Sequence, residues 1–229
     1  MFRTLALIVP LVLLLPVEGI PGAAPAGAQS PDAATQEALA VLEVAAERYL
    51  ALDGFCARFE QEVQNDILGQ NRQSRGELCQ LRSDRFEMRF TDPEGDRVVA
   101  DGRHLWLYFP STDAGQVFRS ALGEGGERFD LHREFLADPG DRYRPTLDGR
   151  EEVAGRMTHV LTLVPTAPSP YVRARIWVDE EDALVRRIEI TEDEGFTRVL
   201  DLRDLELNPG VSPERFVFEP PRGVQIIER

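Results

Sequence analysis

Residues 76–110 read GELCQLRSDRFEMRFTDPEGDRVVADGRHLWLYFP, and this stretch decides the fold. Between residues 85 and 90, apolar and charged side chains alternate, which is typical of a strand with one buried face and one wet face. Turn residues at 92–95 and the pair Asp101-Gly102 predict two hairpin connections. We therefore expect an antiparallel meander over this stretch.

The strand expected at 103–109 is apolar on both of its faces. One face carries Leu105, Leu107 and Phe109, and the other carries His104, Trp106 and Tyr108. A strand of this kind needs cover on both sides. The protein core supplies one cover, and the other has to be a lid, a partner or a bound apolar ligand.

Residues 1–28 have the pattern of a signal peptide. Arg3 precedes an apolar run at 5–15, and small residues at 26–28 predict cleavage near Ala28. The run is too short to span a membrane, and no Cys follows it that would become lipidated. We therefore expect export to the periplasm and a single domain at 29–229.

The charge balance and the missing motifs exclude several classes of function. With 40 acidic against 26 basic residues, the formal net charge is −14, which argues against nucleic acid as a partner. The three histidines have no metal-ligand spacing, and no hydrolase or phosphate-binding motif is present. We expect no catalytic residues, no metal and no cofactor. A catalytic pair hidden among the acidic residues stays open, although a solvated surface is the favoured interpretation.

The only cysteines, Cys56 and Cys79, are predicted to form a disulfide. A lone pair in an exported chain favours a disulfide over a metal site. A hairpin of strands 55–63 and 74–81, turning near 67–68, places the two residues opposite each other. Such a bridge stabilises by roughly 3 kcal/mol in the loop-entropy model, and we favour this structural role over a redox role.

Strand patterns dominate the rest of the chain. One amphipathic helix is expected from Pro31 to about Leu52, a short second helix at 130–138, and a Gly-rich loop at 111–128. The expected strands are 55–63, 74–82, 85–91, 96–100, 103–109, 151–155, 157–164, 171–179, 184–191, 195–207 and 215–219. In the strand at 195–207 the apolar parity flips between Leu202 and Leu205, which predicts a bulge or a bend that curves the sheet. About 11 short strands predict one large, strongly curved antiparallel sheet or a partial barrel.

The order and spacing of several short motifs make the chain recognisable. It resembles the outer-membrane lipoprotein carrier protein family, LolA, and the resemblance covers nearly the whole chain after the signal peptide. The motifs are RSDRF at 82–86, VADG at 99–102, LWLY at 105–108, IWVD at 176–179 and FVFEPPRGV at 216–224. The resemblance implies a mainly β fold, in which an unclosed antiparallel β-barrel and a lid of helices enclose an apolar cavity.

The same resemblance implies a function. Members of this family are periplasmic carriers that take lipid-modified proteins from an inner-membrane ABC transporter, shield their acyl chains and pass them to an outer-membrane receptor, LolB. We expect a monomer without enzymatic activity. Two alternatives stay open: a periplasmic module that senses lipid or lipoprotein on the same fold, and an enzyme acting on envelope lipid, for which no motif is present.

Site residues follow from the resemblance as well. Arg82 matches the family arginine that hydrogen-bonds the lid in the closed state, although a surface arginine at a strand end is the alternative. Ordinary packing in the core or beneath a short helix is the alternative for the expected cavity residues. The residues expected to line the acyl-chain cavity are Phe86, Met88, Phe90, Leu105, Leu107, Leu131, Phe135 and Leu136.

Overall fold

Twelve strands of the computed structural model form one sheet, in the order β12-β6-β5-β4-β3-β2-β1-β11-β10-β9-β8-β7. The structure describes residues 33–65, 69–82, 85–122, 132–193 and 195–228, so the predicted signal peptide lies outside the described part. Residues 31–229 form one compact unit. The strands are β1 (Gly54–Asn65), β2 (Gln70–Leu81), β3 (Arg85–Asp92), β4 (Glu94–Asp101), β5 (His104–Tyr108), β6 (Gln116–Ala121), β7 (Tyr143–Val153), β8 (Arg156–Pro165), β9 (Arg173–Asp179), β10 (Val185–Thr191), β11 (Phe196–Leu207) and β12 (Gln225–Glu228).

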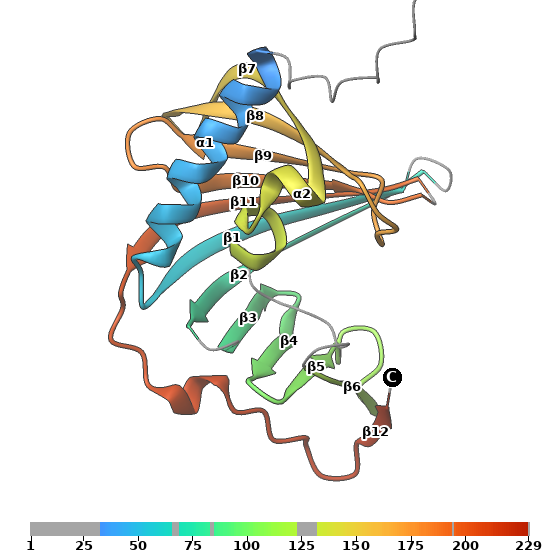
Figure 1. The fold of residues 1–229 in the computed structure, drawn as a ribbon. Helices are drawn as coiled ribbons and strands as arrows, with labels where there is room; N and C mark the ends of the chain where they lie inside the picture. Colours follow the sequence, from blue (N-terminus) through green and yellow to red (C-terminus); the bar gives the residue numbers. More distant parts are fainter. Residues whose placement is uncertain (1–32, 66–68, 83–84, 123–131, 194, 229) are drawn as a thin grey trace, which may run out of the picture. The chain divides into compact units, whose positions relative to one another are not determined.

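The sheet consists of two antiparallel meanders that meet along one pair of strands. Strands β1 to β6 follow one another in the first meander, and β7 to β11 do so in the second (Figure 1). The two meet where β1 pairs with β11, from Phe55 opposite Leu207 to Asn65 opposite Phe196, and we call this pairing the seam. Because the sheet ends at β7 and at β12 instead of closing, the predicted unclosed, mainly β fold is confirmed.

Bulges curve the sheet. At Gly76 the pairing of β2 with β3 shifts register, and a Cβ atom there would lie 2.1 Å from the carbonyl oxygen of Arg89, so only glycine fits. Along the seam the register shifts between Cys56 and Arg58, opposite Asp204, which has a φ of 49°. The parity flip predicted between Leu202 and Leu205 is therefore confirmed as a bulge.

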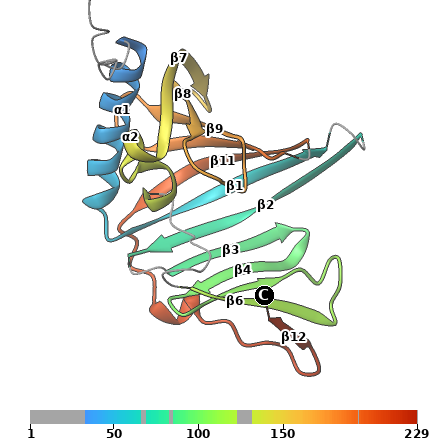
Figure 2. The same ribbon diagram turned by 45° about the vertical axis from the view of Figure 1, so that its right-hand side comes forward.

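Helices cover one face of the sheet (Figures 1 and 2). Helix α1 (Ala33–Leu50) buries Ala38, Leu42, Ala45 and Tyr49, one stripe at three- and four-residue spacing, as the sequence predicts. The expected second helix is shorter and irregular. Its described part is a π-helical turn, η1 (His132–Leu136), whereas residues 130 and 131 lie outside the described part. The four-residue helix α2 (Pro139–Arg142) follows it and was not predicted.

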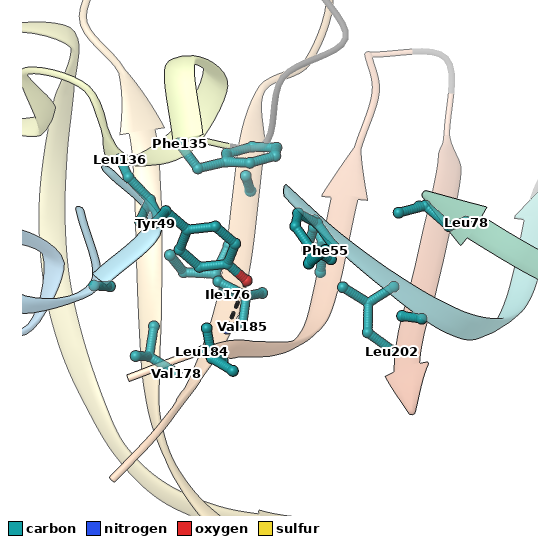
Figure 3. Close-up of a cluster of buried hydrophobic side chains, with 14 of the residues drawn as sticks. Tyr49, Phe55, Leu78, Phe135, Leu136, Ile176, Val178, Leu184, Val185 and Leu202 are labelled. Carbon is teal, nitrogen blue, oxygen red and sulfur yellow. Dashed lines mark hydrogen bonds between the residues drawn. The ribbon is translucent and has the colours of Figure 1, made fainter. Parts of the chain in front are cut away.

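The main core lies between α1, η1 and the sheet (Figure 3). Tyr49 of α1 packs edge-on against Phe55 of β1, with ring centroids 5.6 Å apart. Its hydroxyl accepts a hydrogen bond of 3.1 Å from the backbone N–H of Val185, which fastens the helix to the first residue of β10. Since this hydroxyl is buried, its pKa is raised above the ordinary value of a tyrosine.

The second apolar face of β5 is covered by the C-terminal segment of the same chain. Phe218 packs on Trp106 and Tyr108, with ring centroids 5.5 and 5.7 Å apart. Arg215 extends this contact by donating a hydrogen bond of 2.6 Å to Glu87, whose side chain is only 3% exposed. The cover that the sequence required is therefore part of the protein itself.

Three expectations about the second half and the C-terminus were wrong. Residues 215–219 are not a strand, because Ser212 caps a 3-10 turn, η2 (Pro213–Phe216), and Phe218 lies on the outer face. The expected loop at 111–128 contains strand β6, and β7 begins at 143 instead of 151. Strand β12 runs parallel to β6, an exception in an otherwise antiparallel sheet.

Candidate ligand-binding cavity

A cavity of about 800 Å³ lies between the inner face of the sheet and the segments η1, α2 and 165–171. This volume falls within the roughly 300–1,000 Å³ that is usual for small-molecule sites. The sheet contributes the floor, and the three segments contribute the cover. The lining residues are Phe55, Gln61, Leu78, Gln80, Phe86, Met88, Glu134, Phe135, Asp141, Arg142, Tyr143, Pro165, Thr166, Ala167, Pro168, Ser169, Pro170, Tyr171, Ile188, Ile190, Glu192, Arg198, Leu200 and Leu202.

Strand alternation explains why most of the floor is apolar, although Gln61, Gln80 and Arg198 also line it. Phe86 and Met88 lie two apart on β3, as Leu200 and Leu202 do on β11, and each pair faces the cavity. Phe55 of β1 and Leu202 of β11, both labelled in Figure 3, line the same cavity. The floor therefore spans the seam and takes residues from both meanders.

The described residues among those expected to line the cavity divide into two groups. Phe86, Met88 and Phe135 lie on the cavity wall. Leu131 lies outside the described residues. The remaining four pack in the main core and do not line this cavity: Phe90, Leu105, Leu107 and Leu136.

Phe90 shows what the core packing consists of. Its ring meets Phe59 edge-on at 5.1 Å and Phe109 at 6.2 Å, so neighbouring aromatic rings fill the space around it. Phe86, four residues earlier on the same face of β3, has the cavity beside it instead.

One end of the cavity is polar, and it is built around Glu134 of η1. The Tyr143 hydroxyl and the Nη1 of Arg142 each lie 2.6 Å from the carbonyl oxygen of Glu134. Tyr171 donates to Oε1 of Glu134 at 2.5 Å, and the two tyrosine hydroxyls lie 2.8 Å apart. We call Arg142, Tyr143 and Tyr171 the donor cluster.

The two tyrosines of the donor cluster, Tyr143 and Tyr171, stay protonated over the whole physiological range. Burial raises the pKa of both Tyr143 and Tyr171. For Tyr171, the hydrogen bond to the carboxylate of Glu134 raises the pKa further. Only 3% of Tyr143 and 7% of Tyr171 is exposed. Both phenols are therefore hydrogen-bond donors held in a largely water-free wall.

Sequence reasoning did not find this polar end. Its residues come from η1, from α2, from the start of β7 and from the position directly after the Pro-rich segment at 165–170, and no spacing motif connects them. A weak signal was available for Tyr171, which begins the strand predicted at 171–179, but none for Tyr143, which lies eight residues before the strand predicted at 151–155.

Arg82 joins the end of β2 to the end of α1. Its Nε donates to the carbonyl oxygen of Leu52 at 2.5 Å, and its Nη2 donates to the carbonyl oxygen of Leu50. These oxygens belong to the last residue of the helix and to the turn that follows it, where carbonyls lack intrahelical partners. The guanidinium thus takes the place of a C-terminal cap for a helix that covers the sheet.

The predicted disulfide between Cys56 and Cys79 is confirmed. The two residues lie directly opposite each other in the pairing of β1 with β2. Because side chains alternate along a strand, the bridge lies on the face opposite to Phe55 and Leu78, which line the cavity. It joins two strands of the cavity floor from behind.

Two further findings limit the chemistry of the described residues. No group of three or more His, Cys, Asp or Glu side chains lies close enough together to hold a metal ion in this part of the chain. Of the helices in the described ranges, none is long and apolar enough to cross a membrane.

Known proteins resemble this chain at three levels. Residues 82–212 match a family model whose description is that of an uncharacterized protein. The outer-membrane lipoprotein carrier protein of Halorhodospira halophila is 30% identical over 166 residues, covering 68% of this chain and 70% of the relative. The protein of the same name from Alkalilimnicola ehrlichii is 28% identical over 182 residues, covering 75% and 76%.

A solved structure supports the fold alone. The crystal structure of an uncharacterized conserved protein from Thermus thermophilus aligns with a TM-score of 0.53 at 13% identity. The alignment covers 85% of this chain and all of the other.

Proposed function

This chain belongs to the outer-membrane lipoprotein carrier protein family, and from that premise we propose that its cavity binds the acyl chains of lipid-modified proteins. The protein would carry them through the periplasm from the inner to the outer membrane. Its partners would be an inner-membrane ABC-type exporter, which loads it, and a LolB-like receptor, which unloads it. The carrier would act as a monomer.

The observation that carries this proposal is the cavity itself. Its floor is formed mostly by apolar side chains of β1, β2, β3, β10 and β11, and its cover consists of short irregular segments. Each methylene removed from water contributes about 0.8 kcal/mol, so a chain of about fifteen methylenes gains roughly 12 kcal/mol. Ordering of the chain and of the cover reduces that gain.

A carrier also has to release its cargo, and the contacts of α1 and η1 favour release. Arg82 fastens the end of α1, which does not line the cavity itself but packs against the cover segments η1 and α2. The donor cluster fastens η1 directly. Both sets of contacts stabilise the protein with its cavity covered. Acyl chains that displace these segments have to offset that stability, so cargo binds less tightly than the cavity area alone implies.

A transfer experiment tests the function. Inner-membrane vesicles carrying a fluorescent triacylated lipoprotein are incubated with the exporter, ATP and the purified protein, and the supernatant is analysed by native mass spectrometry. We expect a one-to-one complex, whose cargo then moves to outer-membrane vesicles. A supernatant without lipoprotein would refute the carrier function. A protein that instead retained only free lipid, and handed nothing on, would favour the sensor.

A further inference from the structure

We propose that the donor cluster is a subsite for the carbonyl oxygens of ester- or amide-linked acyl chains, and that Glu134 occupies this subsite while the cavity is covered. The proposal rests on the carrier function and assigns it a chemical selectivity. The cavity would recognise the linkage at the head of an acyl chain in addition to its methylenes.

The first argument is the convergence of donors on one residue. Arg142, Tyr143 and Tyr171 come from α2, from the start of β7 and from the segment before β9, yet all three contact Glu134. Together they donate hydrogen bonds to the carbonyl oxygen and to the carboxylate of Glu134, and a longer contact of 3.5 Å joins Arg142 Nη2 to Oε2. Glu134 thus presents several acceptor oxygens to a fixed set of donors.

The second argument is the location of these donors. All three line the same cavity as Phe86 and Met88. The cavity therefore combines these donors with an apolar wall, to which Gln61, Gln80, Glu192 and Arg198 add further polar groups. An acyl chain likewise combines a polar and an apolar part, with carbonyl oxygen at its head and methylenes along its length.

The third argument is the cost of leaving the donors unpaired. Tyr143 and Tyr171 are almost completely buried while η1 is in place, so their hydroxyls have Glu134 as a partner instead of water. An acyl chain that takes the place of η1 again keeps water away from these hydroxyls. A buried hydroxyl without an acceptor is destabilising. A ligand with carbonyl oxygens can supply the acceptors, whereas a hydrocarbon or an ether chain cannot supply an equivalent group.

Because Glu134 belongs to the cover segment η1, Glu134 and a ligand carbonyl would replace each other at the donors as η1 moves. Its neighbour Phe135 lines the cavity and lies against Tyr171, with ring centroids 6.3 Å apart. Movement of η1 therefore frees the donors and enlarges the apolar space together. Return of Glu134 to the donors would displace the ligand carbonyl and assist release.

The test compares two lipids that differ only in these oxygens. One is a synthetic dipalmitoyl-glyceryl lipopeptide with ester linkages, and the other is its dihexadecyl ether analogue. Both carry the same fluorophore, and binding is measured by anisotropy with the full-length mature protein. We expect wild-type protein to prefer the ester lipid by about tenfold, as one or two additional hydrogen bonds provide.

The variant Tyr143→Phe/Tyr171→Phe removes both hydroxyls and keeps both rings. It should lower the preference for ester over ether to about one, whereas Tyr108→Phe, on the outer face of β5, should leave it at the wild-type value. If the double variant does not fold, Tyr171→Phe alone and the wild-type ratio still decide. Equal affinity of wild-type protein for both lipids would refute the subsite and leave the carrier function intact.

Two other outcomes are distinguishable. Failure of wild-type protein to bind either lipid would refute the carrier function. Palmitic acid serves as a third probe, because its carboxylate also offers acceptor oxygens to Arg142. Displacement of the ester lipid by palmitate at a lower concentration than by unlabelled ester lipid would overturn the assignment to linked acyl chains.

Discussion

Replacing Arg82 by leucine should make the protein hold its cargo more tightly. The substitution removes two hydrogen bonds, to the carbonyl oxygens of Leu50 and Leu52, and keeps an apolar stem. A hydrogen bond to a charged group is worth about 1.5–3 kcal/mol, but 57% of the Arg82 side chain is exposed, so solvent screens part of this. We therefore expect the covered state to lose about 1–2 kcal/mol in total.

That loss converts directly into affinity. If cargo binds only to the uncovered state, weakening the covered state by about 1–2 kcal/mol raises the apparent affinity by roughly 5- to 30-fold. The effect should appear as slower release of a fluorescent triacylated lipopeptide to acceptor vesicles, measured by stopped-flow dequenching. Arg75→Leu is the matched control, because Arg75 is an exposed arginine of β2, the strand that ends just before Arg82, and it pairs with Asp92. Release from the Arg82 variant at the wild-type rate would refute the role of this arginine in release.

Three further predictions concern the cavity wall, the disulfide and the buried carboxylate of Asp179. Phe86→Glu should abolish binding of an acyl probe in a folded protein, because a charged group in an apolar wall costs several kcal/mol, whereas Val172→Glu, at a 43% exposed position, should bind normally. The double variant Cys56→Ser/Cys79→Ser, which opens a loop with a separation of 23 residues, should lower the free energy of unfolding in urea by roughly 3 kcal/mol. An unchanged urea midpoint would contradict this. At Asp179, burial alone would raise the pKa, but hydrogen bonds from Arg156, Arg186 and two backbone N–H groups outweigh it and lower the pKa. Because the pKa of Asp179 is lower in the folded state than in the unfolded state, this carboxylate stabilises the fold above about pH 4, and the stabilisation is lost as the pH falls further. The variant Asp179→Asn should therefore lower the free energy of unfolding by about 3 kcal/mol at pH 7 and make unfolding less dependent on acid.

Local patterns predicted the elements whose neighbours are close in sequence. The alternation around Phe86 identified β3, and the three- and four-residue spacing identified α1. The Cys56–Cys79 bridge followed from a single hairpin. In each case the residues that decide the structure lie within one element or one turn of each other.

Elements that depend on distant partners were missed. Strand β6 has no alternating pattern, and it forms because β5 and β12 pair with its two edges. Phe216 and Phe218 alternate as in a strand, but Phe218 covers Trp106 from a segment without sheet hydrogen bonds. Tertiary contacts override local preference in such segments.

The cavity was harder to predict than the sheet for a similar reason. Phe86 and Phe90 lie on the same face of β3 and have the same chemistry, yet only Phe86 borders the cavity. The difference lies in Phe59 and Phe109, which fill the space beside Phe90. Empty space is a property of the surrounding elements, so a strand pattern cannot locate it.

The seam between β1 and β11 has a consequence for how the protein is made. Each meander consists of hairpins that can form from nearby residues, whereas the seam joins residues such as Phe55 and Leu207 across most of the chain. Pairings over such separations are slow to form, because a long loop has to close first. The cavity wall uses Phe55 from one side of the seam and Leu202 from the other, so it does not exist until this pairing is complete. Under the proposed carrier function, binding of an acyl chain therefore requires that β11, the last long strand, has already paired with β1.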